Sequence, residues 1–327
     1  MPSEAELRTL EILVTEKSVS ELSEDLEYSL SYTSEVVSKL EEKGLVDTRK
    51  EGKQRLVSLS ESKATELYRK LVQSHSHVDW EGLLSGKAVE ILFYLDEPVS
   101  ASELAEMTDT HRVTVHRILD RFLKRGIVQK HDSRYRLNEN FLTVNDFSKE
   151  YFHQVHREIT SSNLLIIDTQ ENIQFKLTFQ DVEKYGSESY DILWENPYTF
   201  LLSTNDSLRI ENPDFHLTGP ERFQEYGIEL ITTDRRHYFY NEDIDEITPQ
   251  ELVCHTLLID DGMRYRTYCL LLIEKEDIHE EVLEVSEKYG IEEIVNSLIR
   301  YLEGEDIVKM PERTEFESAA RKYGVDV

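Results

Sequence analysis

The sequence predicts a multidomain α+β protein in which two copies of a small helical unit precede a larger region of strands and helices. Three observations support this fold class. A stretch near the N-terminus repeats at a fixed offset, each repeat ends in alternating residues, and strand-like runs precede helix-like runs in the second half. With 327 residues, 39% of them hydrophobic, the chain is long enough for two or three separate cores.

The internal repeat has an offset of 82 residues. It aligns SVSEL, residues 18–22, with SASEL, residues 100–104, and EEKGLV, residues 41–46, with LKRGIV, residues 123–128, without a gap. A fixed spacing of this kind is typical of one structural unit that occurs twice. We therefore expect two domains of the same fold, which we call copy 1 and copy 2.

Each copy should begin with two helices. Apolar residues at helical spacing predict a first helix over residues 4–15 in copy 1 and over residues 86–95 in copy 2. Ser18 and Ser100 are the expected N-caps of a short second helix, because a glutamate follows each serine by three residues and completes a capping box.

A third helix and a hairpin should complete each copy. In copy 2 the residues at i, i+3, i+4, i+7 and i+8 form an apolar stripe: Val115, Ile118, Leu119, Phe122 and Leu123. Gly44 and Gly126 are the expected C-terminal caps of the third helices. Alternating residues then predict a two-stranded hairpin that turns near Gly52 in copy 1 and near Ser133 in copy 2.

Three helices followed by a β-hairpin form a winged helix, a variant of the helix-turn-helix. We expect one winged helix over residues 1–78 and a second over residues 79–141. A connecting or dimerisation helix should follow over residues 142–162, because apolar side chains recur there at helical spacing. Residues 163–327 should form a separate acidic domain with a role in regulation or partner binding.

The charge of the chain is strongly negative but uneven. The chain has 37 Lys and Arg against 66 Asp and Glu, a net charge of −29. Residues 1–140 have a net charge of −6, and residues 141–327 have a net charge of −23. A dispersed excess of acids keeps a protein hydrated in concentrated salt, so we expect a halophilic cytoplasm. Against this background, residues 111–136 hold eight bases and two acids.

This basic segment predicts a DNA-binding helix in copy 2. With the apolar stripe facing the core, the opposite side of the third helix exposes groups that suit base edges and phosphates in a major groove. The candidates on this helix are Thr110, His111, Arg112, Thr114, Arg117, Arg121 and Lys124. The candidates on the hairpin, which would reach the adjacent backbone, are Lys130, Arg134 and Arg136. The alternative is a solvated helix face without a partner.

Copy 1 has a less basic third helix. The positions equivalent to the three long basic side chains of copy 2 hold Glu35, Lys39 and Glu42. Its hairpin is more basic and contributes Arg49, Lys50, Lys53 and Arg55. We expect copy 2 to make the main base contacts. Copy 1 should contact DNA through Lys39 and its hairpin, or serve as a packing or dimerisation module.

The two segments ASELAEMTDTHRVTVHRILDRFLKRGIV and SVSELSEDLEYSLSYTSEVVSKLEEKGLV resemble archaeal MarR-like and TrmB-like winged-helix transcription regulators. The resemblance covers about the first 140 residues of the chain. It implies sequence-specific binding to double-stranded DNA, commonly as a homodimer on a palindrome. Winged helices also serve as protein-interaction domains, so the resemblance leaves the partner open.

The second half reads as strands followed by helices, which indicates an α+β domain. Strand-like runs cover residues 163–168, 173–179, 198–204, 228–233 and 237–241. Helical patterns cover residues 248–259, where Thr248 and Glu251 form a capping box, and residues 265–273, 279–289 and 291–302.

Residues 160–305, with LTFQDVEKYG at 177–186 and ITPQELVCHTLLID further on, resemble the C-terminal domain of AbiEi-type regulators. Those proteins are winged-helix antitoxins that repress their own operon, and the resemblance implies a nucleotidyltransferase-like fold. An antitoxin that holds a basic toxin through its acidic half is therefore the alternative function. It would use residues 163–327 as a protein-binding surface.

A working nucleotidyltransferase is the less favoured reading, and we expect no enzymatic activity. Gly186 and Ser187 could supply the phosphate-binding turn of such an enzyme. However, no Asp-x-Asp pair for two metal ions follows them closely. The pair formed by Asp243 and Asp245 comes more than 50 residues later.

No cofactor, metal site or membrane segment is expected. The His153 and His156 pair lacks a third ligand, so we interpret it as a surface pair, and the same holds for the histidines at 75 and 77. Cys254 and Cys269 lie in apolar runs, as buried and reduced thiols do. The absence of a basic and apolar leader and of a long apolar run predicts a cytoplasmic protein.

Overall fold

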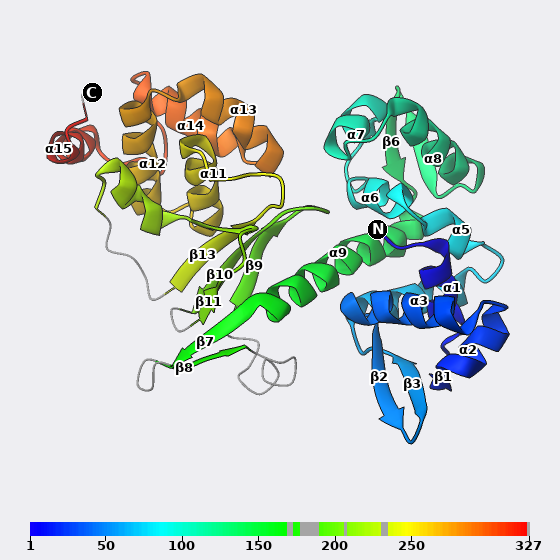
Figure 1. Ribbon diagram of the computed structural model, residues 1–327. Coiled ribbons are helices and arrows are strands. Elements are labelled where there is room, and N and C mark those ends of the chain that lie inside the picture. The colour runs from blue at the N-terminus through cyan, green and yellow to red at the C-terminus, as the bar shows by residue number, and fades with distance from the viewer. Residues whose placement is uncertain (169–172, 177–189, 206–207, 230–234, 326–327) are drawn as a thin grey trace. The chain divides into compact units, whose positions relative to one another are not determined.

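The computed structural model describes residues 1–168, 173–176, 190–205, 208–229 and 235–325 (Figure 1). The chain divides into two compact units, Met1–Thr160 (unit 1) and Ser161–Val327 (unit 2). Both combine helices with small antiparallel sheets. The predicted multidomain α+β class is therefore confirmed.

Copy 1 has three helices and a hairpin in the predicted order. The helices are α1 (Glu4–Ile12), α2 (Val19–Leu26) and α3 (Leu30–Glu42), and the hairpin strands are β2 (Val46–Glu51) and β3 (Gln54–Leu59). A two-residue strand, β1 (Lys17–Ser18), pairs with β3 and makes a three-stranded sheet in the order β1-β3-β2. The short strand was not predicted, since two residues are too few to show alternation.

Copy 2 repeats this order of elements. Its helices are α6 (Lys87–Phe93), α7 (Ala101–Met107) and α8 (Arg112–Lys124), and its sheet contains β4 (Val99–Ser100), β5 (Val128–His131) and β6 (Arg134–Leu137). The strand order β4-β6-β5 matches that of copy 1. Helices α3 and α8 begin and end at positions 82 residues apart, so the repeat seen in the sequence is also a repeat of structure.

Local capping explains why these helices start and stop where they do. The Ser18–Glu21 and Ser100–Glu103 capping boxes are both formed, as predicted, and a third one joins Ser3 to the N3 residue of α1. After α3 and α8 the chain turns through Gly44 and Gly126, whose φ angles are +65° and +68°. Glycine tolerates this left-handed conformation, which would strain any residue with a Cβ.

Three further helices complete unit 1. Helices α4 (Lys63–Ser74) and α5 (Trp80–Leu84) lie between the copies in the chain and were not predicted, whereas α9 (Leu142–Asn163) corresponds to the predicted connecting helix. Its apolar stripe is buried in one hydrophobic cluster that spans both copies: Val144, Phe147, Tyr151 and Phe152. These four side chains pack inside their own chain, which fits the predicted connecting role, and the predicted role in dimerisation stays a prediction. Helix α9 itself continues past the boundary into unit 2.

Unit 2 contains two small antiparallel sheets. One has the order β12-β13-β10-β9 and the other the order β11-β7-β8. The strands are β7 (Leu164–Asp168), β8 (Ile173–Lys176), β9 (Tyr190–Glu195), β10 (Phe200–Asn205), β11 (Leu208–Ile210), β12 (Phe215–Thr218) and β13 (Arg235–Tyr240). Four predicted strands correspond to β7, β8, β10 and β13. The run predicted at 228–233 does not form a strand at Ile228 and Glu229, and its remaining residues lie outside the described part.

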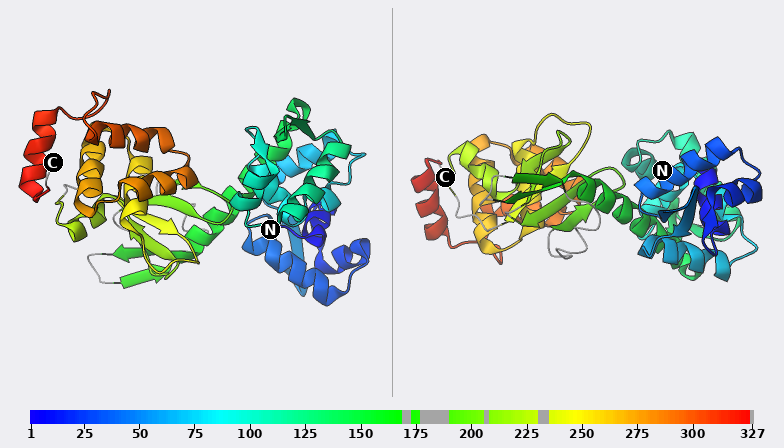
Figure 2. Two further views of the ribbon diagram at one scale, coloured as in Figure 1. Left: turned by 90° about the horizontal axis from the view of Figure 1, so that it is seen from above. Right: turned by 60° about the horizontal axis from the view of Figure 1, so that its bottom comes forward.

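Five helices follow the strands, in the order that the sequence predicts for an α+β domain. They are α11 (Pro249–Ile259), α12 (Met263–Glu276), α13 (His279–Tyr289), α14 (Glu292–Leu302) and α15 (Arg313–Tyr323). Figures 1 and 2 show α11 to α14 grouped beside the green and yellow-green strands, whereas the red α15 lies further out, next to α12. Helix α11 contacts both β9 and β12. Thr248 and Glu251 form the predicted capping box, whereas α15 was not predicted.

Candidate nucleic-acid interface

Helix α8 has one buried face and one exposed face. Val115, Ile118, Leu119 and Phe122 are buried in the core of unit 1, as their helical spacing predicts. On the opposite side Val113, Arg117, Asp120 and Lys124 form one exposed line at i, i+4, i+7 and i+11. Val113 is 68% exposed. Val113 and Asp120 were not among the predicted contact residues, although helical spacing from Arg117 places both on its face.

The structure exposes only some of the candidates on this helix. The exposed ones are His111, Arg112, Arg117 and Lys124, and the half-buried ones are Thr110, Thr114 and Arg121. Arg121 was expected on the outer face, but its guanidinium donates a hydrogen bond to the carbonyl oxygen of Gly82 on α5. Thr114 and Arg121 are seven residues apart, so both lie on the border between the buried and the exposed face.

Two candidates at the start of α8 have structural roles. His111 is the N-cap, and its Nδ1 accepts a hydrogen bond from the Val113 backbone N–H at 3.3 Å. The Thr110 hydroxyl donates to the carbonyl oxygen of Thr108 at 2.9 Å. These contacts fix the turn between α7 and α8, and they leave Arg112 and Arg117 as the exposed bases of the first half of the helix.

The hairpin of copy 2 places its bases at the protein surface. Arg134 donates to the Pro98 carbonyl oxygen at 2.7 Å and pairs with Glu103 at 3.0 Å, so it also holds the hairpin against the start of α7. Lys130 and Tyr135 are partners across strands β5 and β6. The Lys130 ammonium lies 5.1 Å from the centre of the Tyr135 ring, within range of a cation–π contact. Arg136 is exposed on the same strand as Arg134.

The two copies differ in how their bases are neutralised. In the described part of the chain, six exposed bases of copy 2 have no ion pair: Arg112, Arg117, Lys124, Arg125, Lys130 and Arg136. In copy 1 most candidates are paired, Lys39 with Glu35 at 2.8 Å, Arg49 with Glu16 at 2.6 Å, and Arg55 with Glu41. Lys50 and Lys53 are exposed at the tip of the hairpin. The cationic surface available to an anionic partner is therefore mainly that of copy 2.

The pKa values in copy 1 reflect this pairing. The hydrogen bond from Arg49 lowers the pKa of Glu16, and the hydrogen bond to Glu35 raises the pKa of Lys39. Both effects stabilise the charged forms of groups that already have a partner within the chain. A nucleic acid that recruited Lys39 or Arg49 would have to compete with these carboxylates.

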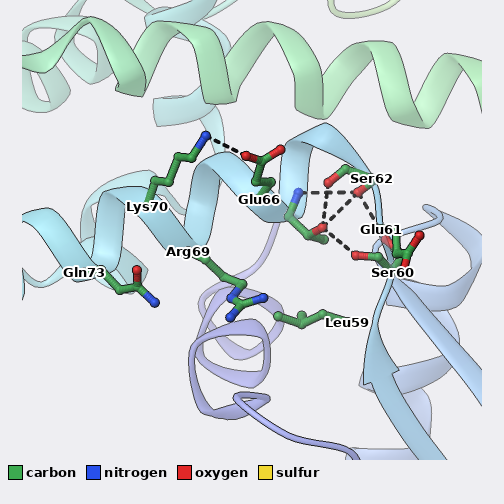
Figure 3. A pocket seen from close by; sticks show the side chains of 9 residues that line it. Leu59, Ser60, Glu61, Ser62, Glu66, Arg69, Lys70 and Gln73 are labelled. Carbon is green, nitrogen blue, oxygen red and sulfur yellow. Dashed lines mark hydrogen bonds and ion pairs between the residues drawn. The ribbon is translucent and has the colours of Figure 1, made fainter.

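Two surface hollows occur in copy 1 and on the helix after it. A hollow of about 540 Å³ beside the hairpin is lined in part by Ser20, Ser31, Ser34, Lys53 and Arg55. A second hollow of about 530 Å³ lies along α4 (Figure 3), where Lys70 pairs with Glu66 and no candidate residue contributes. Figure 1 shows the hairpin β2–β3 and strand β6 at opposite ends of unit 1, so the two copies present their hairpins in different directions.

The residues considered for catalysis and metal binding do not form a site in the described part. Gly186, Ser187 and the segment 177–186 lie outside the described residues. Asp243 and Asp245 are exposed in the loop before α11. Among the described residues, no group of three or more His, Cys, Asp and Glu could hold a metal ion.

Other expectations concern single residues. His156 is buried, so the interpretation of His153 and His156 as a surface pair was wrong for this histidine. Cys254 and Cys269 are free and buried, as predicted, and burial raises the pKa of the Cys254 thiol to about 12. None of the described helices combines the length and the hydropathy that a membrane-spanning helix needs.

Two family models match parts of the chain. The model described as the HVO_A0261 N-terminal domain matches residues 83–157, which include α6, α7, α8, the hairpin of copy 2 and most of α9. The C-terminal domain model HVO_2833_C matches residues 212–325. Both are haloarchaeal families. Similarity to haloarchaeal proteins agrees with the acidic composition, and neither description states a function. No curated protein matches the chain.

Proposed function

We propose that this protein is a transcription regulator that binds double-stranded DNA in a sequence-specific way. In this proposal both copies in unit 1 are winged helices and copy 2 is the main reader. The observation that carries the proposal is the set of exposed and unpaired bases on α8 and β6, in a chain whose net charge is −29. A local positive charge in so acidic a protein is expected where the protein binds a polyanion.

The shape of copy 2 suits a major groove. A major groove admits one α-helix, and α8 projects its exposed line away from the core of unit 1. In this proposal Arg117 would donate two hydrogen bonds to a guanine, and Arg112 and Lys124, towards the two ends of the helix, would contact phosphates. Lys130 and Arg136 on the hairpin would reach the neighbouring backbone.

Copy 1 supports binding in a secondary way. Its third helix offers Lys39 only in competition with Glu35, and its hairpin tip offers Lys50 and Lys53. Because the hairpins point in different directions, copy 1 would contact a different stretch of duplex from copy 2. A homodimer would place two α8 helices on the half-sites of a palindrome.

Genome-wide occupancy of the tagged protein in a halophilic host tests this proposal. We expect discrete peaks that share one sequence motif, and a matching band shift with purified full-length protein. Uniform background occupancy together with no retention on any duplex would contradict DNA binding. Peaks confined to the protein's own operon would indicate an autoregulator.

A second function is favoured by the charge of the other half. Residues 141–327 have a net charge of −23, which suits a basic protein partner such as a toxin. Under this alternative the tagged protein should co-purify with a small basic protein in equimolar amount, at moderate salt. Copy 2 would then serve only to repress the operon that encodes the pair.

A further inference from the structure

Asp120 is an acid in the middle of the cationic face of α8. It lies three residues after Arg117 and four before Lys124, on the exposed line opposite the buried stripe. Either neighbour could pair with it along the helix. In the described part of the chain, however, Asp120 makes neither an ion pair nor a side-chain hydrogen bond.

Within the described residues, no contact accounts for an acid at this position. Aspartate is a poor helix former, and at this position it neither caps the helix nor faces its first turn. Two other acids of copy 2 do have partners, since Glu103 completes a capping box and pairs with Arg134, and Asp132 pairs with His131 at the hairpin turn. A carboxylate here also repels phosphates, so it weakens binding to DNA in general.

We propose that Asp120 determines sequence specificity by accepting a hydrogen bond from the N4 amino group of a cytosine in the major groove. This inference rests on the proposed function. Cytosine presents a donor in the major groove, whereas guanine presents two acceptors that a carboxylate would repel. The residue thus lowers affinity for wrong sequences more than for the right one, which is how a repulsive group creates specificity.

Two other residues on the exposed line of α8, Arg117 and Val113, suit other bases. Arg117 and Asp120 differ by a rise of about 4.5 Å along the helix, which lies between one and two base-pair steps of about 3.4 Å. Arg117 suits guanine, and the exposed methyl groups of Val113 suit the methyl group of a thymine. The exposed line therefore offers three different chemistries to neighbouring base pairs.

Copy 1 lacks this arrangement. The position equivalent to Asp120 holds Ser38, whose hydroxyl accepts a hydrogen bond from the Arg55 guanidinium at 3.2 Å. The position in copy 1 that corresponds to Asp120 is thus already bonded to the β2–β3 hairpin. Cytosine selection belongs to copy 2 alone.

Selection of bound sequences from a randomised duplex pool tests the inference. The full-length chain is compared with Asp120→Ala, Asp120→Asn and the control Asp146→Asn, which makes the same change of charge on an exposed position of α9. The wild-type and control proteins should select one motif with a C·G pair at a defined position. In Asp120→Ala the preference for C·G over other base pairs should fall about tenfold at that position alone. This variant should also bind unrelated duplex more tightly, because it lacks the carboxylate that repels phosphates. Asp120→Asn should shift the preference towards adenine, which pairs with an amide.

The outcomes separate this inference from the proposed function. A wild-type motif that Asp120→Ala leaves unchanged would overturn the role of Asp120 and keep the DNA-binding function. A wild-type protein that selects no motif and retains no duplex would overturn both. Circular dichroism melting of each variant confirms folding, and alanine at an exposed helix position should not lower the melting temperature.

Discussion

The guanidinium of Arg121 donates a hydrogen bond to the carbonyl oxygen of Gly82, and so joins α8 of copy 2 to α5. This residue is therefore part of the packing of unit 1, although its position in the sequence suggested a contact with DNA. The bases of α8 then fall into two groups, one that supports the helix and one that faces outwards.

Arg121→Ala should destabilise unit 1 more than it weakens DNA binding. Loss of a hydrogen bond from a charged donor to a half-buried carbonyl costs about 1–2 kcal/mol. Urea unfolding of the full-length variant would measure this loss. An unchanged midpoint combined with a large loss of DNA affinity would instead place Arg121 at the interface.

Arg117→Glu should abolish specific binding, whereas Lys39→Glu should have a small effect. Arg117 is exposed and unpaired in the described part, so its reversal removes a base contact worth about 1–3 kcal/mol and adds repulsion. Lys39 is already neutralised by Glu35. Fluorescence anisotropy with one duplex would compare the affinities of the two variants. Equal losses of affinity would contradict the assignment of copy 2 as the main reader.

Duplex affinity should rise when KCl is increased from about 0.1 M to about 1 M, because salt screens the repulsion between phosphates and the acidic half. This is opposite to the usual counterion-release slope. Titrations of the full-length protein at a series of salt concentrations provide the measurement. A steep decrease in affinity with salt would show that local cationic contacts dominate.

Unit 2 should lose stability in mild acid through His255. This buried ring is hydrogen-bonded to the Thr218 hydroxyl at 2.9 Å and to the Tyr289 hydroxyl at 2.8 Å, and burial lowers its pKa well below the usual value. The unfolded chain then binds the proton first, so stability is present above about pH 6.5 and decreases as the pH falls below it. Urea unfolding at several pH values should show a shallower pH dependence for His255→Gln than for the wild type. The same slope in both proteins would assign the acid sensitivity to other groups.

Gly44→Ala should destabilise unit 1 more than Gly126→Ala. Both glycines have a positive φ, which costs an alanine about 1–2 kcal/mol. A Cβ at Gly44 would also collide with the Glu158 carboxylate, whereas a Cβ at Gly126 would meet nothing within 4 Å. Thermal melting of the two variants provides a matched comparison. Equal melting temperatures would show that the Glu158 side chain moves away without cost.

The fold of unit 1 was largely predictable because its signals are local. Capping serines predicted the starts of α2 and α7, and apolar stripes and terminal glycines predicted the extent of α3 and α8. The strands β9, β11 and β12 were not predicted, since they are short or carry charged residues such as Asp191 and Glu195. The position of Arg121 could not be predicted either, because it depends on α5, a five-residue helix that contacts α8 only in the folded chain.

Helix α9 also decides how the chain can be divided for experiments on its halves. Its residues up to Thr160 belong to unit 1 and its last turn belongs to unit 2, so the boundary between the units falls inside a helix. Strand β7 begins at Leu164, directly after this helix. A truncated chain that ends at residue 160 would therefore lack the last turn of α9, and a chain that ends at Asn163 would retain the whole helix.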